Sequence, residues 1–124
     1  VRLGTAEFYA VVEEMPEITD SLVVHLEDPA GGPGELLLFV VPAPGHAVDD
    51  ALVARVRTEL RTALSPRHVP DRVLALPAVP RTRTGKKLEV PAKRILLGAD
   101  PDTVASRDSL VDPAALEPFV DARA

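Results

Sequence analysis

The chain has 124 residues, of which 46% are hydrophobic and 27% are charged, and its formal net charge is -5. This composition is typical of a small globular protein with a modest core. The absence of cysteine excludes disulfides, thiolate metal sites and a cysteine nucleophile. Because the apolar runs are far shorter than the roughly 20 residues that cross a bilayer and no signal peptide is recognisable, we expect a cytoplasmic protein that binds no membrane.

The charges are strongly segregated along the chain. Residues 1–50 carry one basic and ten acidic side chains (net -9), residues 51–98 carry eleven and three (+8), and residues 99–124 carry two and six (-4). A basic middle segment in an acidic protein favours phosphorylated small ligands, and a basic face that only balances its acidic neighbours is the alternative. No aromatic residue lies in the basic segment to stack on bases, so we expect no nucleic-acid binding.

The first predicted element is a helix that follows Gly4. Thr5 is the expected N-cap, and Glu7 lies in the first turn, where the helix dipole favours an acidic residue. An apolar stripe at helical spacing continues to Pro16, and we assign it to the core: Phe8, Val11, Val12 and Met15.

Two stretches rich in β-forming residues come next, at 19–27 and 35–41, with the turn-rich segment 28–34 between them. A connection of seven residues is too short for a crossover, so we expect an antiparallel pair. A third, shorter apolar strand is predicted at residues 72–78.

Between the second and third strands, a helix is predicted from a cap at Asp49 or Asp50 to about Leu64. Arg57 and Arg61 are i, i+4 neighbours and share another face of this helix, which the spacing alone indicates to be solvated. The apolar residues expected on the inward side are Leu52, Val56, Leu60 and either Ala63 or Leu64.

The segment RTRTGKK at residues 81–87 is predicted to be a hairpin tip that meets an anion, since it holds four of the fourteen basic side chains. Gly85 allows the backbone to bend at positive φ, and Lys86 then projects outward on a flexible stem. A solvated loop is the alternative interpretation. A P-loop is excluded because it requires glycine where Pro80 stands and Ser or Thr where Lys87 stands.

A further helix is predicted from Glu89, with Pro91 in its first turn, to a closing glycine at Gly98. Its expected apolar contacts are Ile95, Leu96 and Leu97. From residue 99 the composition shifts to Asp, Pro, Ser and Ala, so we expect at most a short helix in residues 112–122 and a tail that lies over another surface or stays mobile.

The predicted elements form an α+β domain at residues 1–98, followed by an extension at residues 99–124. The fold expected for the domain is a small mixed sheet of about three strands plus a β-hairpin, covered by helices. His25 lies in a strand pattern without the partners of a catalytic triad, so we assign it a structural role. His46 and His68 lack metal-ligand spacing to another His or carboxylate, and we expect no metal.

The string LPAVPRTRTGKK at residues 76–87 resembles the C-terminal signature of the AMP-forming (adenylate-forming) acyl-CoA synthetases, a proline and a Thr/Ser-rich turn that ends in Gly-Lys. Residues 1–24, VRLGTAEFYAVVEEMPEITDSLVV, are similar to the opening of the small C-terminal lid domain of that superfamily. The continuation at residues 87–110, KLEVPAKRILLGADPDTVASRDSL, is similar to that of the acetoacetyl-CoA synthetases. The resemblance thus covers essentially the whole chain.

This resemblance implies roles for five residues. Lys86 is the implied adenylation lysine, which assists the attack of an acid on the α-phosphate of ATP, and Thr84 and Gly85 form the turn that supports it. Gly4 is implied to line the CoA tunnel, and Arg57 to reach the phosphates of CoA. ATP and CoA are then substrates, and Mg²⁺ accompanies ATP on a larger domain.

The implied reaction converts a small-molecule acid, acetoacetate, with ATP and CoA to acetoacetyl-CoA, AMP and pyrophosphate. Because the chain begins at Val1 rather than at a methionine, we expect a large N-terminal adenylate-forming domain to precede it and the chain alone to be catalytically incomplete. A lysine acetyltransferase and a deacetylase acting on Lys86 are further implied partners. The alternatives are the lid domain of an acetyl-CoA or other short-chain acyl-CoA synthetase, and a noncatalytic anion-binding module.

Overall fold

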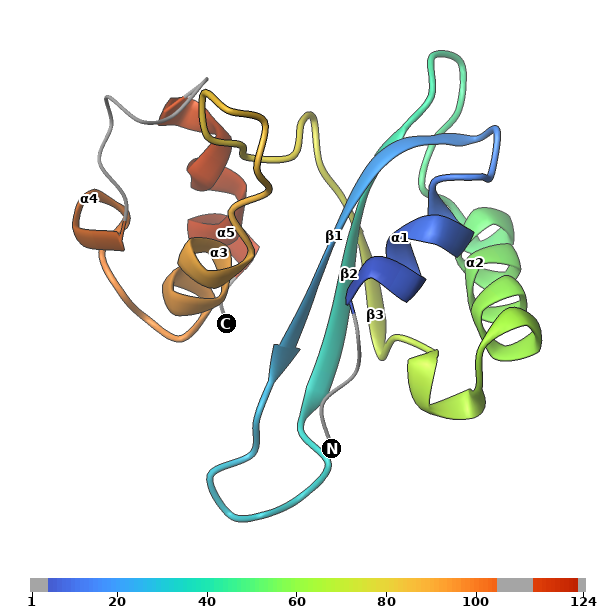
Figure 1. Ribbon diagram of the computed structural model, residues 1–124, viewed down its shortest axis with the longest axis horizontal. Coiled ribbons are helices and arrows are strands. Elements are labelled where there is room, and N and C mark those ends of the chain that lie inside the picture. Colours follow the sequence, from blue (N-terminus) through green and yellow to red (C-terminus); the bar gives the residue numbers. More distant parts are fainter. Residues whose placement is uncertain (1–4, 105–112, 123–124) are drawn as a thin grey trace. The chain divides into compact units, whose positions relative to one another are not determined.

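The computed structural model describes residues 5–104 and 113–122 of the chain. The chain divides into two compact units, Val1–Leu76 and Pro77–Ala124. The first unit contains the sheet (Figure 1), and its elements in chain order are α1 (Thr5–Val12), β1 (Ile18–Leu26), β2 (Glu35–Pro42), α2 (Asp50–Ala63), η1 (Pro66–His68) and β3 (Arg72–Ala75).

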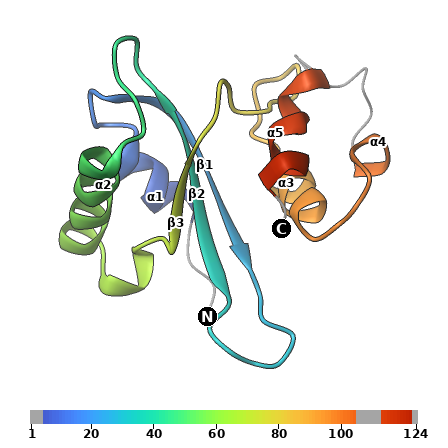
Figure 2. The same ribbon diagram turned by 180° about the vertical axis from the view of Figure 1, so that it is seen from behind.

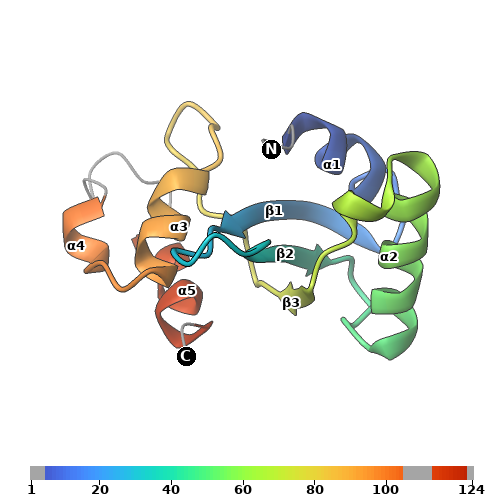
Figure 3. The same ribbon diagram turned by 90° about the horizontal axis from the view of Figure 1, so that it is seen from below.

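The sheet has the strand order β1-β2-β3, and Figure 3 shows β2 between its two neighbours. β1 runs antiparallel to β2, with Leu22 opposite Phe39, whereas β3 runs parallel to β2, with Leu74 opposite Phe39. The parallel neighbour is possible because α2 supplies the crossover connection. The α+β class, the antiparallel pair and the mixed sheet predicted from the sequence are therefore confirmed.

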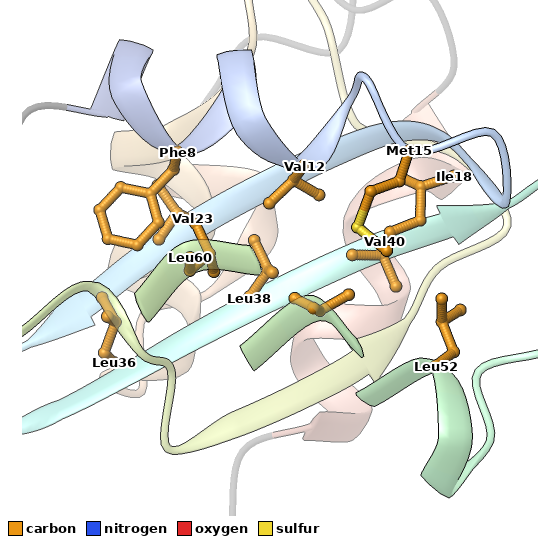
Figure 4. Close-up of a cluster of buried hydrophobic side chains, with 11 residues drawn as sticks. Phe8, Val12, Met15, Ile18, Val23, Leu36, Leu38, Val40, Leu52 and Leu60 are labelled. Atoms are coloured by element: carbon orange, nitrogen blue, oxygen red, sulfur yellow. The ribbon is translucent and has the colours of Figure 1, made fainter. Parts of the chain in front are cut away.

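Both helices of the first unit pack on one face of this sheet (Figure 2). Leu36, Leu38 and Val40 alternate along β2 and share that face, because side-chain direction in a strand has a period of two. Each apolar side chain that is fully buried stabilises the fold by roughly 1.5–3 kcal/mol. The buried cluster, drawn in Figure 4, consists of Phe8, Val12, Met15, Ile18, Val23, Leu36, Leu38, Val40, Leu52, Val56 and Leu60.

The N-terminus of α2 is capped as the sequence predicts. The Asp49 carboxylate accepts a hydrogen bond from the backbone N–H of Leu52 (N to Oδ1, 2.9 Å), which satisfies one of the amides that a helix start leaves without a partner. Of the predicted inward residues, Ala63 is exposed and Leu64 packs against the core.

His68 joins η1 to α1. Its Nδ1 lies 2.7 Å from the Ser65 hydroxyl, and its Nε2 lies 3.4 Å from the Glu7 carboxylate. Its ring centroid is 5.0 Å from that of Phe8. The ring is therefore packed and hydrogen-bonded within the first unit.

The second unit is helical beyond the hairpin at residues 81–87. α3 contacts both α4 and α5, and Phe119 of α5 is fully buried, so the short helix predicted near the C-terminus is confirmed. The helices are α3 (Glu89–Leu96), α4 (Pro101–Val104), η3 (Pro113–Leu116) and α5 (Glu117–Ala122). The division of the chain into residues 1–98 and 99–124 stays a prediction.

Three details predicted for the helices are wrong. Thr5 is itself helical, so it is not the N-cap of α1. Met15 lies beyond the end of α1, and its side chain reaches the core through a turn in which its N–H donates to the Val12 carbonyl (3.1 Å). Leu97 is the C-cap of α3 and is 63% exposed, because Gly98 turns the chain away at a φ of +108°.

Candidate functional site: the hairpin at residues 81–87

The two arms of the hairpin are joined by a short antiparallel ladder. The Leu88 N–H donates to the Pro80 carbonyl (3.0 Å) and the Thr82 N–H donates to the Lys86 carbonyl (2.9 Å). These two bonds flank the bridge between Arg81 and Lys87. Pro80 and Leu88 are buried, so the base of the hairpin is anchored while its tip is exposed.

The tip is a β-turn closed by the Gly85 N–H, which donates to the Thr82 carbonyl (2.9 Å). Arg83 and Thr84 hold the two central positions at negative φ, and Gly85 follows at a φ of +88°. A turn followed by a residue of positive φ is the usual way to close a hairpin loop of three residues. The positive φ predicted for Gly85 is confirmed, and it is the reason that the turn needs glycine there.

Lys86 follows this glycine with its backbone fixed and its side chain exposed. Its carbonyl accepts from the Thr82 N–H, and its own N–H donates to the Thr82 hydroxyl (N to Oγ1, 3.2 Å). The Lys86 ammonium makes no hydrogen bond or ion pair with any residue that the structure describes. It is therefore available to an incoming anion.

The ladder also separates Lys86 from Lys87. Residues opposite each other in an antiparallel pair project to the same face, and neighbours along a strand project to opposite faces. Thr82 and Lys86 thus share one face of the hairpin, and Arg81 and Lys87 share the other. The prediction that adjacent lysines point apart agrees with this register.

Four cations and no acidic residue lie between positions 81 and 88. One of the cations has a structural task, because the Arg81 guanidinium donates from Nη1 to the Gly85 carbonyl (2.8 Å). A set of like charges at an exposed tip creates a positive potential that favours anions such as phosphates. The turn thus presents Lys86 within a basic surface.

The other residues predicted for the site belong to the first unit. Gly4 lies outside the described residues. Arg57 donates from Nε to the Pro70 carbonyl (3.3 Å) and from Nη2 to the Asp71 carbonyl (2.9 Å), so it ties α2 to the segment before β3. Its predicted contact with CoA and that of Gly4 stay predictions.

Sequence reasoning missed the part that Thr82 plays in this turn. Thr84 is expected to form the turn that supports the lysine, and it lies at a central position of that turn. The backbone contacts with Lys86 are made by Thr82, whose hydroxyl lies 2.9 Å from the Thr84 hydroxyl. A signal was present, because Ser and Thr at the first position of a turn commonly bond to backbone amides that follow.

Neither a metal site nor a membrane span is found in the described part of the chain. No group of three or more His, Cys, Asp or Glu side chains there is placed to hold a metal ion. No helix within residues 5–104 and 113–122 is long and apolar enough to cross a membrane.

Comparisons with known proteins place this geometry in context. The family model of the AMP-binding enzyme C-terminal domain matches residues 7–86, and its match thus ends at Lys86. Acetoacetyl-CoA synthetase of Caenorhabditis elegans is 40% identical over 123 residues, which are 99% of this chain and 17% of that protein.

Two solved structures extend the comparison. Acetoacetyl-CoA synthetase from Streptomyces lividans is 42% identical with a TM-score of 0.90, over 98% of this chain and 18% of that chain. The amide bond synthetase McbA from Marinactinospora thermotolerans is 28% identical with a TM-score of 0.65, over 76% of this chain and 18% of that chain. The chain spans less than a fifth of the length of these relatives.

Proposed function

Because the chain belongs to the family of AMP-binding enzyme C-terminal domains, we propose that it is the lid domain of an ATP-dependent, AMP-forming acid:CoA ligase. The observation that carries the proposal is the hairpin tip, where Lys86 stands exposed after Gly85 with both of its backbone groups bonded to Thr82. A larger adenylate-forming domain is the proposed partner, and it would hold the acid, ATP and the Mg²⁺ that accompanies ATP.

In the first half-reaction, a carboxylate oxygen of the acid attacks the α-phosphorus of ATP, and the bond to pyrophosphate breaks. The products are an acyl-adenylate and pyrophosphate. Negative charge is crowded on both reacting groups, so a fixed cation at their junction stabilises the transition state. The Lys86 ammonium is our candidate for that cation.

In the second half-reaction, the CoA sulfur attacks the acyl carbon, the bond to AMP breaks, and the thiol proton is released. A cation fixed at the α-phosphate is not needed for this step. We propose that Gly4 allows the pantetheine arm to approach the backbone, because glycine has no Cβ, and that Arg57 meets the CoA phosphates. The contacts of Arg57 with Pro70 and Asp71 hold its position on α2.

We propose acetoacetate as the acid. The support is that proteins named acetoacetyl-CoA synthetase match this chain almost end to end, at 40% and 42% identity over 99% and 98% of it. The family model, in contrast, stops at Lys86. The region after the lysine is therefore shared with the relatives that carry this name.

The test is to assay the complete enzyme with ATP and CoA against acetoacetate, acetate and butyrate. Formation of AMP, pyrophosphate and the thioester is followed for each acid. We expect acetoacetate to give the highest kcat/KM. A higher kcat/KM with acetate or butyrate would show that acetoacetate is not the preferred substrate. The absence of thioester with every acid would favour a noncatalytic anion-binding module.

A further inference from the structure

Thr82 is the residue through which the fold holds Lys86. Its N–H donates to the Lys86 carbonyl (2.9 Å), its carbonyl accepts from the Gly85 N–H (2.9 Å), and its hydroxyl accepts from the Lys86 N–H (3.2 Å). Both backbone groups of Lys86 and the turn that precedes it are thus bonded to one residue. We propose that the Thr82 hydroxyl is a positioning group for Lys86, an inference that rests on the adenylation role proposed above.

No hydrogen bond or ion pair with a described residue orients the Lys86 side chain, which is exposed. The direction in which its stem leaves the hairpin is therefore set by its backbone alone. A cation is effective in catalysis when it is oriented before the charge develops. Holding the backbone at both the N–H and the carbonyl supplies that orientation.

The effect of the Thr82 hydroxyl on Lys86 can be measured separately from the effect of the turn itself. Replacing Thr82 by valine keeps a β-branched side chain of nearly the same shape and leaves the bonds made by the Thr82 N–H and carbonyl in place. It removes only the oxygen that accepts from Lys86 and that lies 2.9 Å from the Thr84 hydroxyl. The change therefore loosens Lys86 while the hairpin ladder persists.

A matched control exists in the first unit. The Thr19 hydroxyl donates to the Val41 carbonyl at 3.2 Å and is likewise exposed. Thr19→Val removes a side chain to backbone hydrogen bond of the same length from a residue that has no part in the hairpin.

The experiment measures ATP–pyrophosphate exchange, which reports adenylation without CoA, and thioester formation from supplied acyl-adenylate, both in the complete enzyme. For Thr82→Val we expect kcat of exchange to fall about 3- to 10-fold, the usual effect of one lost hydrogen bond. The KM values for ATP and the acid and the thioester step should be unchanged. Thr82→Ser should restore exchange, and Thr19→Val should leave it at the wild-type rate.

Three outcomes would contradict the proposal. Normal exchange in Thr82→Val, with exchange lost in Lys86→Ala, overturns the positioning role and leaves the proposed function standing. Equal losses in both half-reactions together with a lower Tm show a role in stability alone. Normal exchange in Lys86→Ala removes the adenylation role itself, and with it the reason for positioning.

Discussion

Replacing Gly85 by alanine tests whether the shape of the turn determines the activity of Lys86. Gly85 sits at a φ of +88°, and apart from its own residue and its two chain neighbours no heavy atom of the described residues lies within 4 Å of the position that a Cβ would take. The cost of alanine is therefore conformational rather than steric, about 1–2 kcal/mol for an L-residue held in the left-handed region. Because the tip is exposed, the strain can be released by local opening of the turn, which releases Lys86.

If the opened turn is inactive in adenylation, a cost of this size lowers the ratio of closed to opened hairpin by about 5- to 30-fold, and the population of the active hairpin by at most that factor. We expect ATP–pyrophosphate exchange in the complete enzyme to fall by up to that factor. Gly85→Asn should lose less, since asparagine adopts positive φ more readily than alanine.

Gly31 provides a matched control for this prediction. It lies at a φ of +89°, and an added Cβ would again have open space beyond its chain neighbours. Its N–H closes a turn by donating to the Asp28 carbonyl (3.0 Å). Gly31→Ala imposes the same backbone strain in the loop between β1 and β2. Equal losses of exchange in both alanine variants, or none in Gly85→Ala, would refute the reasoning.

Two further predictions concern the second half-reaction and regulation. Gly4→Leu is expected to spare ATP–pyrophosphate exchange and to block thioester formation from supplied acyl-adenylate, because a side chain would fill the space proposed for pantetheine; a normal thioester rate would show that Gly4 is only a turn residue. Acetylation of Lys86 removes the positive charge, so we expect loss of exchange only, reversed by a deacetylase. Mass spectrometry locates the modified lysines, and full exchange with Lys86 stoichiometrically acetylated would contradict both the switch and the catalytic role.

The parts of the fold that sequence reasoning predicted correctly depend on local patterns. The antiparallel pair follows from two β-rich stretches with a short connection, and the start of α2 follows from Asp49 ahead of an apolar stripe. The bend at Gly85 follows from the conformational freedom of glycine. Each of these features is determined by residues that are close together in the sequence.

The wrong or missing predictions concern residues whose positions are determined by tertiary contacts. Met15 fits the periodicity of a helix, yet α1 ends at Val12 and the core receives Met15 from a turn. Other contacts are not predicted at all: the His68 imidazole lies 3.4 Å from the carboxylate of Glu7, which is distant in the sequence. The bond between the Thr82 hydroxyl and the Lys86 N–H depends on Thr82 holding the first position of the turn, and the register of the hairpin shows that position.

The most direct test of the account is the effect of Lys86→Ala on the two half-reactions of the complete enzyme. The proposed role predicts that ATP–pyrophosphate exchange falls by about 10²–10³, the usual loss when one group that stabilises developing charge is removed. Thioester formation from supplied acyl-adenylate should stay near the wild-type rate, and Lys87→Ala should be far milder because Lys87 lies on the other face of the hairpin. Equal losses in both half-reactions, or undiminished exchange, would contradict the assignment of Lys86 as the adenylation lysine.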